Sequence, residues 1–191
     1  MEAFKTIYEK NLWKNKETRS GRGSTLEFTR PLRLVLPAIL KKLETKYLLD
    51  AGCGDFNWLK EVDLGKIKYV GCDVVESLIA DNVLKYKKAK RTFIVRDLTK
   101  DVLPKADTIL CRACLFHLSN ANVVKALNNF KASGATWLLA TTHPHVEFNL
   151  EIKDGQWRRL NLENILGPAM EKIPDGPGDD GYIGIWKLKE E

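Results

Sequence analysis

The sequence predicts an α/β fold in which helices cover both faces of a mostly parallel, seven-stranded sheet that ends in an antiparallel hairpin. Short apolar runs bounded by turn residues alternate with segments whose apolar residues recur at helical spacing. Two final strand-like runs flank residues 174–181, which are all proline, aspartate or glycine and therefore typical of a hairpin loop. With 191 residues and 44% hydrophobic content, the chain is the size of one domain with a full core.

The N-terminal region is predicted to contain an amphipathic helix and a polar loop. Residues 1–16 place four apolar side chains at helical spacing: Phe4, Ile7, Tyr8 and Leu12. Trp13 could join that apolar face or cover a pocket. Residues 18–25 are polar and punctuated by glycine, so they form either a flexible linker or a lid. The lid interpretation rests on Arg19 and Arg22, which could reach a carboxylate or a phosphate.

A second helix is predicted to follow, with Thr29 as its N-cap and Pro31 in its first turn. Its apolar stripe comprises Leu32, Val35, Leu36, Ile39, Leu40 and Leu43. Because Pro37 lies inside this stripe, we expect a kink or two short helices.

Five apolar runs are predicted to form the parallel strands: residues 47–49, 67–72, 92–95, 107–111 and 136–141. We expect helices at 55–60, at 76–86 and after Ser119, the last with Val123, Val124, Leu127 and Phe130 on one face. Residues 146–162 are irregular and rich in polar and aromatic side chains. The hairpin strands are predicted at 169–173 and 182–188.

Composition points to a soluble cytoplasmic protein. No apolar run approaches the roughly 20 residues of a membrane span, and residues 1–16 are too charged for a signal peptide. The net charge of +6 comes from basic residues that are spread along the chain among 25 acids, which makes nucleic acid the weaker choice of partner. Cys111 and Cys114 lack the second pair of ligands that a zinc site needs, so no metal site is predicted.

The stretch from Asp50 to Asp55 carries the clearest functional signal. An apolar strand ends in Asp50, and Gly52 and Gly54 follow, where backbone can approach a ligand closely. Asp73 ends the next strand 19 residues after Gly54, the spacing at which nucleotide-binding folds place an acid on ribose hydroxyls. A dinucleotide is disfavoured, because Asn57 replaces the third glycine of that motif and Asp55 would repel a pyrophosphate.

These acids and glycines resemble the first two motifs of the class I S-adenosylmethionine-dependent methyltransferases, which have a Rossmann-like sandwich fold. The resemblance implies S-adenosylmethionine as cofactor and S-adenosylhomocysteine as product. It also implies that the first acid and the glycine turn contact the methionine part, that Asp73 holds the ribose, and that Asp97 and Leu98 contact adenine. The expected cofactor residues are Asp50, Gly52, Cys53, Gly54, Asn57, Trp58, Asp73, Val74, Asp97, Leu98 and Cys111.

A longer resemblance connects the chain to a family of small bacterial and viral class I methyltransferases of unassigned substrate. The matching segments are residues 21–27, 50–58, 97–107, 138–142, 157–162 and 184–188. Family members have an aspartate where this chain has Ala113. We expect a single methyltransferase domain, with N-terminal helices and lid loop at 1–45, a cofactor-binding core at 46–142, and a substrate-side insert and hairpin at 143–191.

The ends of the fourth and fifth strands face the cofactor methyl group in this fold, which makes Arg112, Ala113, His117 and His143 the catalytic candidates. His117 suits a general base near neutral pH, although a histidine satisfied in the core fits equally well. If the turn after Ala113 is helical, Ala113 and His117 point the same way. The residues expected at the substrate or in the lid are Trp13, Arg19, Arg22, His145, Trp157 and Arg158.

The leading hypothesis is methyl transfer to a small-molecule or glycan acceptor. Two alternatives stay open: a nucleic-acid methyltransferase, and a cofactor-binding protein with impaired turnover because Ala113 replaces the expected acid. A nicotinamide oxidoreductase fits least well, given Asn57.

Overall fold

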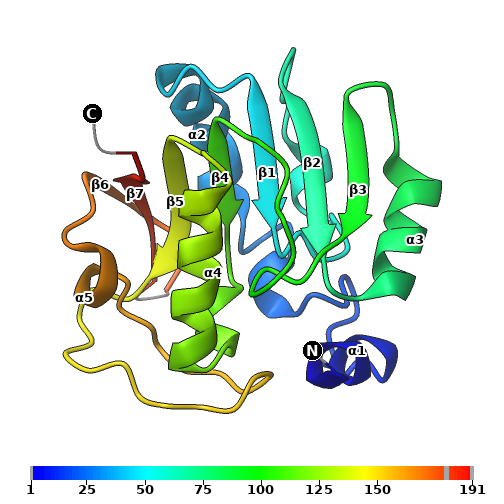
Figure 1. Cartoon of the computed structure of the whole chain (residues 1–191). Coiled ribbons are helices and arrows are strands. Elements are labelled where there is room, and N and C mark those ends of the chain that lie inside the picture. Colours follow the sequence, from blue (N-terminus) through cyan, green and yellow to red (C-terminus); the bar gives the residue numbers. More distant parts are fainter. Residues whose placement is uncertain (1, 179–180, 190–191) are drawn as a thin grey trace.

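The computed structural model describes residues 2–178 and 181–189. Seven strands form one sheet in the order β3-β2-β1-β4-β5-β7-β6 (Figure 1). Strands β1 to β5 run parallel, whereas β7 is antiparallel to both β5 and β6. The strands are β1 (Tyr47–Ala51), β2 (Lys68–Asp73), β3 (Arg91–Val95), β4 (Thr108–Cys111), β5 (Trp137–Thr142), β6 (Glu171–Pro174) and β7 (Tyr182–Lys187). The predicted sheet and its closing hairpin are confirmed; Asp179 and Asp180 of the predicted hairpin loop lie outside the described residues.

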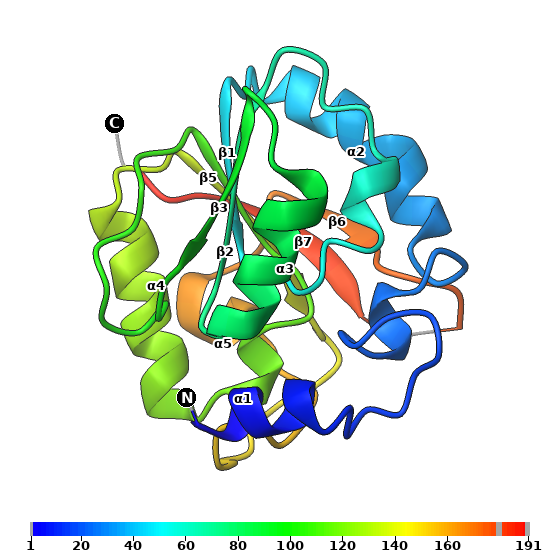
Figure 2. The same cartoon turned by 90° about the vertical axis from the view of Figure 1, so that its right-hand side faces the viewer.

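Helices cover both faces of this sheet. They are α1 (Glu2–Glu9), α2 (Arg30–Lys42), α3 (Glu76–Tyr86), α4 (Asn120–Ala132) and α5 (Glu163–Leu166). Figure 2 shows α2 and α3 on one face and α4 on the other. Because neighbouring strand residues point to opposite faces, Leu48 joins the core under α2 and α3, and Leu49 joins the core under α4.

The N-terminal helix is shorter than predicted and ends at Glu9. Asn11 and Lys14 have φ angles of 46° and 51°, a left-handed conformation that a right-handed helix cannot contain. Leu12 consequently leaves the helical face and is 50% exposed, while Ile7 and Tyr8 are buried as expected.

The helix predicted at residues 55–60 is also wrong. Gly54 and Phe56 both have positive φ angles, so the chain stays in turns until a short 3₁₀ helix, Leu59–Glu61. In contrast, α3 begins and ends where the sequence predicts.

Helix α2 continues through Pro37, so the prediction of two short helices is wrong. Leu32, Leu36, Ile39 and Leu40 are buried on both sides of the proline, and this continuous apolar contact outweighs the loss of one backbone hydrogen bond. Val35, which the predicted stripe includes, faces outward and is 39% exposed.

The sequence predicts N-cap residues for two helices, and only one of these residues caps its helix with its side chain. Ser119 accepts a hydrogen bond from the Asn122 N–H at the start of α4. Thr29 occupies the N-cap position of α2, but its hydroxyl donates to the Thr25 carbonyl instead. Val124, predicted on the apolar face of α4, is 44% exposed.

The parallel strands bring the functional segments to one edge of the sheet. Their registers pair Ala51 with Cys72, Asp73 with Val95, and Cys111 with Ala140, so the turns that follow β1, β2 and β4 lie together. Helix α1 lies across this edge (Figure 1). Among residues 2–178 and 181–189, no helix has the length and apolar character needed to cross a membrane.

Candidate active site at the carboxyl edge of the sheet

Two adjoining pockets open at this edge of the sheet. The larger comprises about 710 Å³ of space between its walls and the smaller about 390 Å³, in each case including space that is open to solvent. Both are lined by Phe4, Gly52, Asp73 and Cys114, so together they form one elongated cleft. No sequence pattern indicated Phe4 or Cys114 as site residues; only the position of α1 over the sheet edge brings Phe4 to the cleft.

Most of the predicted site residues line this cleft. The larger pocket contains Trp13, Arg19, Asp50, Cys53, Gly54, Trp58, Arg112, Ala113 and His117, and the smaller one contains Val74 and Leu98. The structure also adds Arg96 to the smaller pocket, which no sequence pattern indicated.

Gly52 and Gly54, the two glycines of the turn after β1, lie against neighbouring side chains with no room for a Cβ atom. Gly52 has a φ of 84°, and a Cβ there would lie 2.6 Å from the Cys114 sulfur. At Gly54, with a φ of 54°, a Cβ would collide with the Ser20 hydroxyl. Both positions therefore need glycine for backbone conformation and for space.

Asp73, the last residue of β2, binds the backbone of the glycine turn that follows β1. Its carboxylate accepts hydrogen bonds from the N–H groups of Gly54, at 3.2 Å, and Val75, at 3.1 Å. Burial raises the pKa of Asp73, although these backbone N–H groups oppose the shift. Each oxygen retains lone-pair capacity for a further donor.

Asp50 lines the larger pocket and is 4% exposed. It accepts a hydrogen bond from the Tyr69 hydroxyl at 2.8 Å. Burial raises the pKa of Asp50 to about 7; the Tyr69 hydrogen bond and the Arg112 charge oppose this shift, and the Asp73 charge adds to it. Asp50 consequently changes charge in the neutral pH range.

The Asp55 side chain holds the segment from Thr18 to Ser20 by hydrogen bonds. The Asp55 carboxylate accepts from the Thr18 hydroxyl at 2.7 Å, from the Arg19 N–H at 2.9 Å and from the Ser20 hydroxyl at 3.0 Å. These contacts favour the lid interpretation of residues 18–25 over a flexible linker for this part of the loop. The sequence analysis assigned Asp55 only a repulsive role and missed this contact between residues 37 positions apart.

Asn57 stabilises the same loop and does not line either pocket. Its side-chain amide donates to Glu17 Oε1 at 2.6 Å and to the Ser24 carbonyl at 3.1 Å. Arg22, predicted in the lid, is exposed and lies outside both pockets.

The turn after β4 is held by a buried network. The Arg112 Nε donates to Asp175 Oδ1 at 2.6 Å, and the Thr141 hydroxyl donates to Asp175 Oδ2 at 3.3 Å. The Ala113 N–H in turn donates to Thr141 Oγ1 at 2.9 Å. Sequence reasoning placed Asp175 in a hairpin loop and missed it, because its partner Arg112 is 63 residues away.

His117 lines the larger pocket beside Trp13, with the two ring centroids 5.3 Å apart. Its Nδ1 lies 2.9 Å from the Gln156 carbonyl, which can only accept, so Nδ1 carries the proton and Nε2 is the free acceptor. Burial lowers the pKa of His117 to about 4, and the Arg158 charge lowers it further.

The turn after Ala113 is not α-helical, so the condition under which Ala113 and His117 would share a helical face is not met. Ala113 has a φ of 50°, and the residues Leu115–His117 form a 3₁₀ turn. Both nevertheless line the same pocket.

No protein-family model matches the chain, and no curated protein matches it significantly. Solved structures do match. Human N-acetylserotonin methyltransferase, in complex with S-adenosylmethionine, aligns over 97% of this chain with a TM-score of 0.66 and 13% identity. This chain spans only 59% of that protein's length.

Two other matches are similar in extent. Magnesium protoporphyrin IX methyltransferase from Synechocystis, with bound S-adenosylhomocysteine, has a TM-score of 0.59 and 18% identity and covers 89% of this chain and 84% of its own. An S-adenosylmethionine-dependent methyltransferase from Clostridium acetobutylicum has a TM-score of 0.64 and 11% identity over 85% of this chain and 92% of its own. The chain has the Rossmann-like fold of the class I methyltransferases.

Several residues predicted from the motifs do not reach the cleft of this methyltransferase fold. Asp97 was expected at the adenine, but its carboxylate accepts from the N–H and hydroxyl of Thr99 and so stabilises the turn after β3. Cys111 is 1% exposed and packs beneath the cleft in the core under α4.

The residues predicted after β5 also lie outside the two pockets of the methyltransferase fold. His143 is buried and accepts a hydrogen bond from the Leu160 N–H at 3.2 Å. Arg158 is buried as well and donates to the Leu118 carbonyl at 2.6 Å, which supports the turn before α4. His145 and Trp157 are exposed.

Proposed function

We propose that this protein is an S-adenosylmethionine-dependent methyltransferase that acts on a small-molecule or glycan-type acceptor. The observation that carries the proposal is the elongated cleft at the carboxyl edge of the sheet, with the glycine turn in its wall and Asp73 in the part common to both pockets. Ligands of open α/β sheets bind at this edge.

The cleft suggests one orientation for the cofactor. The adenine lies in the smaller pocket between Val74 and Leu98, and the ribose hydroxyls donate to Asp73. The methionine part then extends over Gly52 into the larger pocket, toward the Asp50 carboxylate. A sulfonium cation suits such a pocket, because nearby carboxylates stabilise positive charge.

Methyl transfer is an in-line displacement. An acceptor atom attacks the methyl carbon, the bond between carbon and sulfur breaks, and its electron pair stays on sulfur as S-adenosylhomocysteine forms. Where the acceptor is a hydroxyl, Nε2 of His117 is the ring nitrogen that is free to receive its proton, although a pKa of about 4 makes this histidine a weak base. Trp13, which stacks on His117, excludes water from the reacting atoms.

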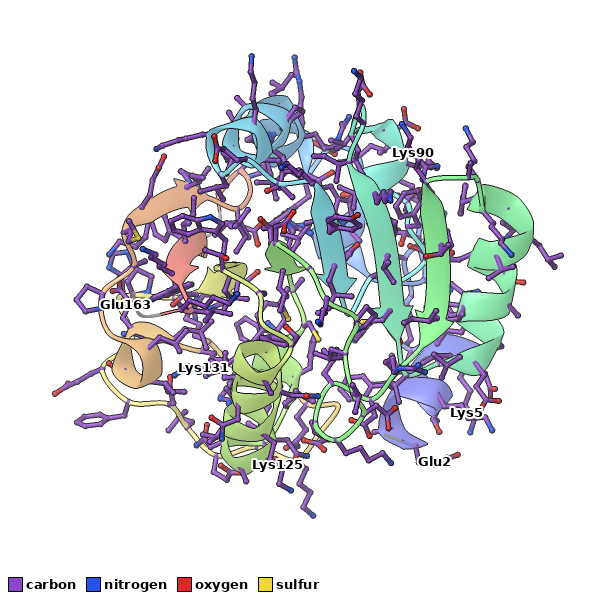
Figure 3. The ribbon with its side chains drawn as sticks, turned by 45° about the horizontal axis from the view of Figure 1, so that its top comes forward. Glu2, Lys5, Lys90, Lys125, Lys131 and Glu163 are labelled. Carbon is purple, nitrogen blue, oxygen red and sulfur yellow. The ribbon has the colours of Figure 1, made fainter. Side chains whose placement is uncertain are left out.

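The distribution of charge favours a small acceptor over nucleic acid. Figure 3 shows Lys5, Lys90 and Lys125 at separate places around the molecule. Other lysines pair with acids, such as Lys42 with Glu171 at 2.7 Å and Lys172 with Glu163 at 2.9 Å. Nucleic-acid binding is favoured by basic residues gathered in one stripe, whereas these three lysines lie apart.

Ala113 supports a second candidate, a cofactor-binding protein with impaired turnover. It lines the larger pocket where the related family has aspartate, and a methyl group can neither accept a proton nor orient a donor. The two candidates share the cofactor site and differ only in the rate of methyl transfer.

Calorimetric titration with S-adenosylmethionine and S-adenosylhomocysteine tests the shared site. We expect Asp73→Ala and Gly52→Val to weaken both ligands by about tenfold or more, through the lost ribose contacts and the collision with Cys114. Asp63→Ala, at an exposed turn acid, is the matched control. Unchanged affinity in the first two variants, or stronger binding of NADH, would contradict the proposed site. Transfer of a labelled methyl group into a metabolite extract, compared with an RNA and DNA preparation, tests the acceptor class.

A further inference from the structure

Arg112 has an unusual environment for an arginine. It is 5% exposed, it lines the larger pocket, and its guanidinium carbon lies 5.2 Å from the Trp58 ring and 5.7 Å from the Phe28 ring. One carboxylate, that of Asp175, pairs with its Nε. The aromatic rings contact the guanidinium without accepting hydrogen bonds in its plane.

The two terminal nitrogens of this guanidinium have no hydrogen-bond partner among the described residues. Buried N–H donors without acceptors are costly, and more so when they carry charge. Both oxygens of Asp175 already have donors, because Oδ1 accepts from the Arg112 Nε and Oδ2 accepts from the Thr141 hydroxyl. Nη1 and Nη2 are thus left as unpaired donors on a side chain that lines the pocket.

We propose that Arg112 is a carboxylate-binding residue of the larger pocket, with Asp175 and Thr141 as the positioning residues that orient it. This inference rests on the proposed function and adds the chemistry of one ligand group to it. A carboxylate matches the paired Nη1 and Nη2 donors because its two oxygens can accept from both at once.

The carboxylate has two possible sources, the methionine part of the cofactor and the acceptor. Asp50 lies close enough to Arg112 for the arginine to lower the pKa of Asp50. The pocket therefore offers one carboxylate and one guanidinium group to a ligand. An α-amino acid zwitterion satisfies both of them. An acceptor that carries a carboxylate would satisfy Arg112 alone and would place its nucleophile near Ala113 and His117.

Arg112→Lys distinguishes these sources. Lysine retains the charge, but its single ammonium group cannot hold both Asp175 and a bidentate carboxylate. If the cofactor is the source, calorimetry should show S-adenosylhomocysteine binding weakened by about tenfold or more, and methylthioadenosine, which lacks the amino-acid part, unchanged. Arg30→Lys, at an exposed arginine of α2, is the control and should leave both affinities unchanged.

If the acceptor is the source, Arg112→Lys leaves both affinities unchanged. In that case benzoate, added to the protein saturated with S-adenosylhomocysteine, should shift the side-chain N–H resonances of Arg112, and the neutral benzamide should not. Unchanged nucleoside affinities together with no benzoate shift would overturn the inference. If neither nucleoside binds the unaltered protein, the proposed function fails instead, and the benzoate titration of the empty protein still tests Arg112.

A second measurement needs no substitution, in case Arg112→Lys does not fold. The unaltered protein is titrated with S-adenosylhomocysteine and with its decarboxylated analogue while the Arg112 resonances are recorded. A cofactor source requires weaker binding of the analogue by about tenfold or more and an Arg112 shift with S-adenosylhomocysteine alone. Equal affinities, no Arg112 shift with either nucleoside and no benzoate shift would overturn the inference.

Discussion

At the scale of single residues, Asp50 is the group whose charge the fold controls most strongly. Its pKa in the folded protein is about 7, above the value of an ordinary carboxylate, because it is buried. The stabilisation that its protonated form contributes to the empty protein is therefore present at low pH and is lost as the pH rises toward 7.

The same group should make cofactor binding depend on pH. A sulfonium cation binds the ionised carboxylate better, so we expect the affinity for S-adenosylmethionine to rise between about pH 6 and about pH 8, by up to about tenfold per pH unit below the pKa. Calorimetry at both pH values measures this rise. Asp50→Asn should flatten it, and an equally steep rise in that variant would assign the titration to another group.

The second prediction for a single residue concerns Ala113. Its φ of 50° suits aspartate better than alanine, so Ala113→Asp should not lower the melting temperature. If the missing acid is a base or a substrate anchor, the variant should transfer labelled methyl groups at least about tenfold faster, with cofactor affinity changed less than about twofold. Ala38→Asp, on the exposed side of α2, controls for the added charge. Equal rates would favour His117 as the base, or an acceptor that needs none.

At the scale of elements, the segment from Thr18 to Ser20 is a part of the site that the Asp55 side chain binds at three residues. Asp55→Ala removes the acceptor of three donors in this segment, and each such hydrogen bond contributes roughly 1 kcal/mol. We expect the amide of Arg19 to exchange with solvent at least about tenfold faster, as measured by hydrogen exchange. Asp63→Ala, in an exposed turn, should leave it unchanged. Unaltered protection in Asp55→Ala would show that other contacts hold the segment.

At the scale of the whole molecule, we expect a buried leucine of the core under α4 to contribute more to the free energy of unfolding than an exposed leucine. Leu127 is 2% exposed on α4, and Leu84 is 85% exposed on α3. Leu127→Ala should lower the free energy of unfolding by about 2 to 5 kcal/mol because it leaves a cavity. Leu84→Ala should change it by less than about 0.5 kcal/mol. Denaturant unfolding of both variants measures the difference, and similar losses would contradict this assignment of the core.

The sequence by itself determined the succession of strands in this protein, and it predicted residues that line one cleft at the carboxyl edge of the sheet. Each strand carries its signal locally, as a short apolar run that ends in a turn, and the closing hairpin marks the antiparallel end of the sheet. Parallel strands place their carboxyl ends at one edge of a sheet. Asp50, Gly52 and Asp73 could therefore be assigned to one site from their positions in the chain.

Only the tertiary structure decided how that cleft is built around these residues. The pairs Thr18 with Asp55, Arg112 with Asp175, and His117 with Gln156 join residues 37, 63 and 39 positions apart. Such contacts are single hydrogen bonds between distant segments, and they leave no periodicity or spacing in the sequence. The left-handed residues that shorten α1 and replace the helix after the glycine turn are likewise set by packing, since asparagine, lysine and phenylalanine do not by themselves require positive φ.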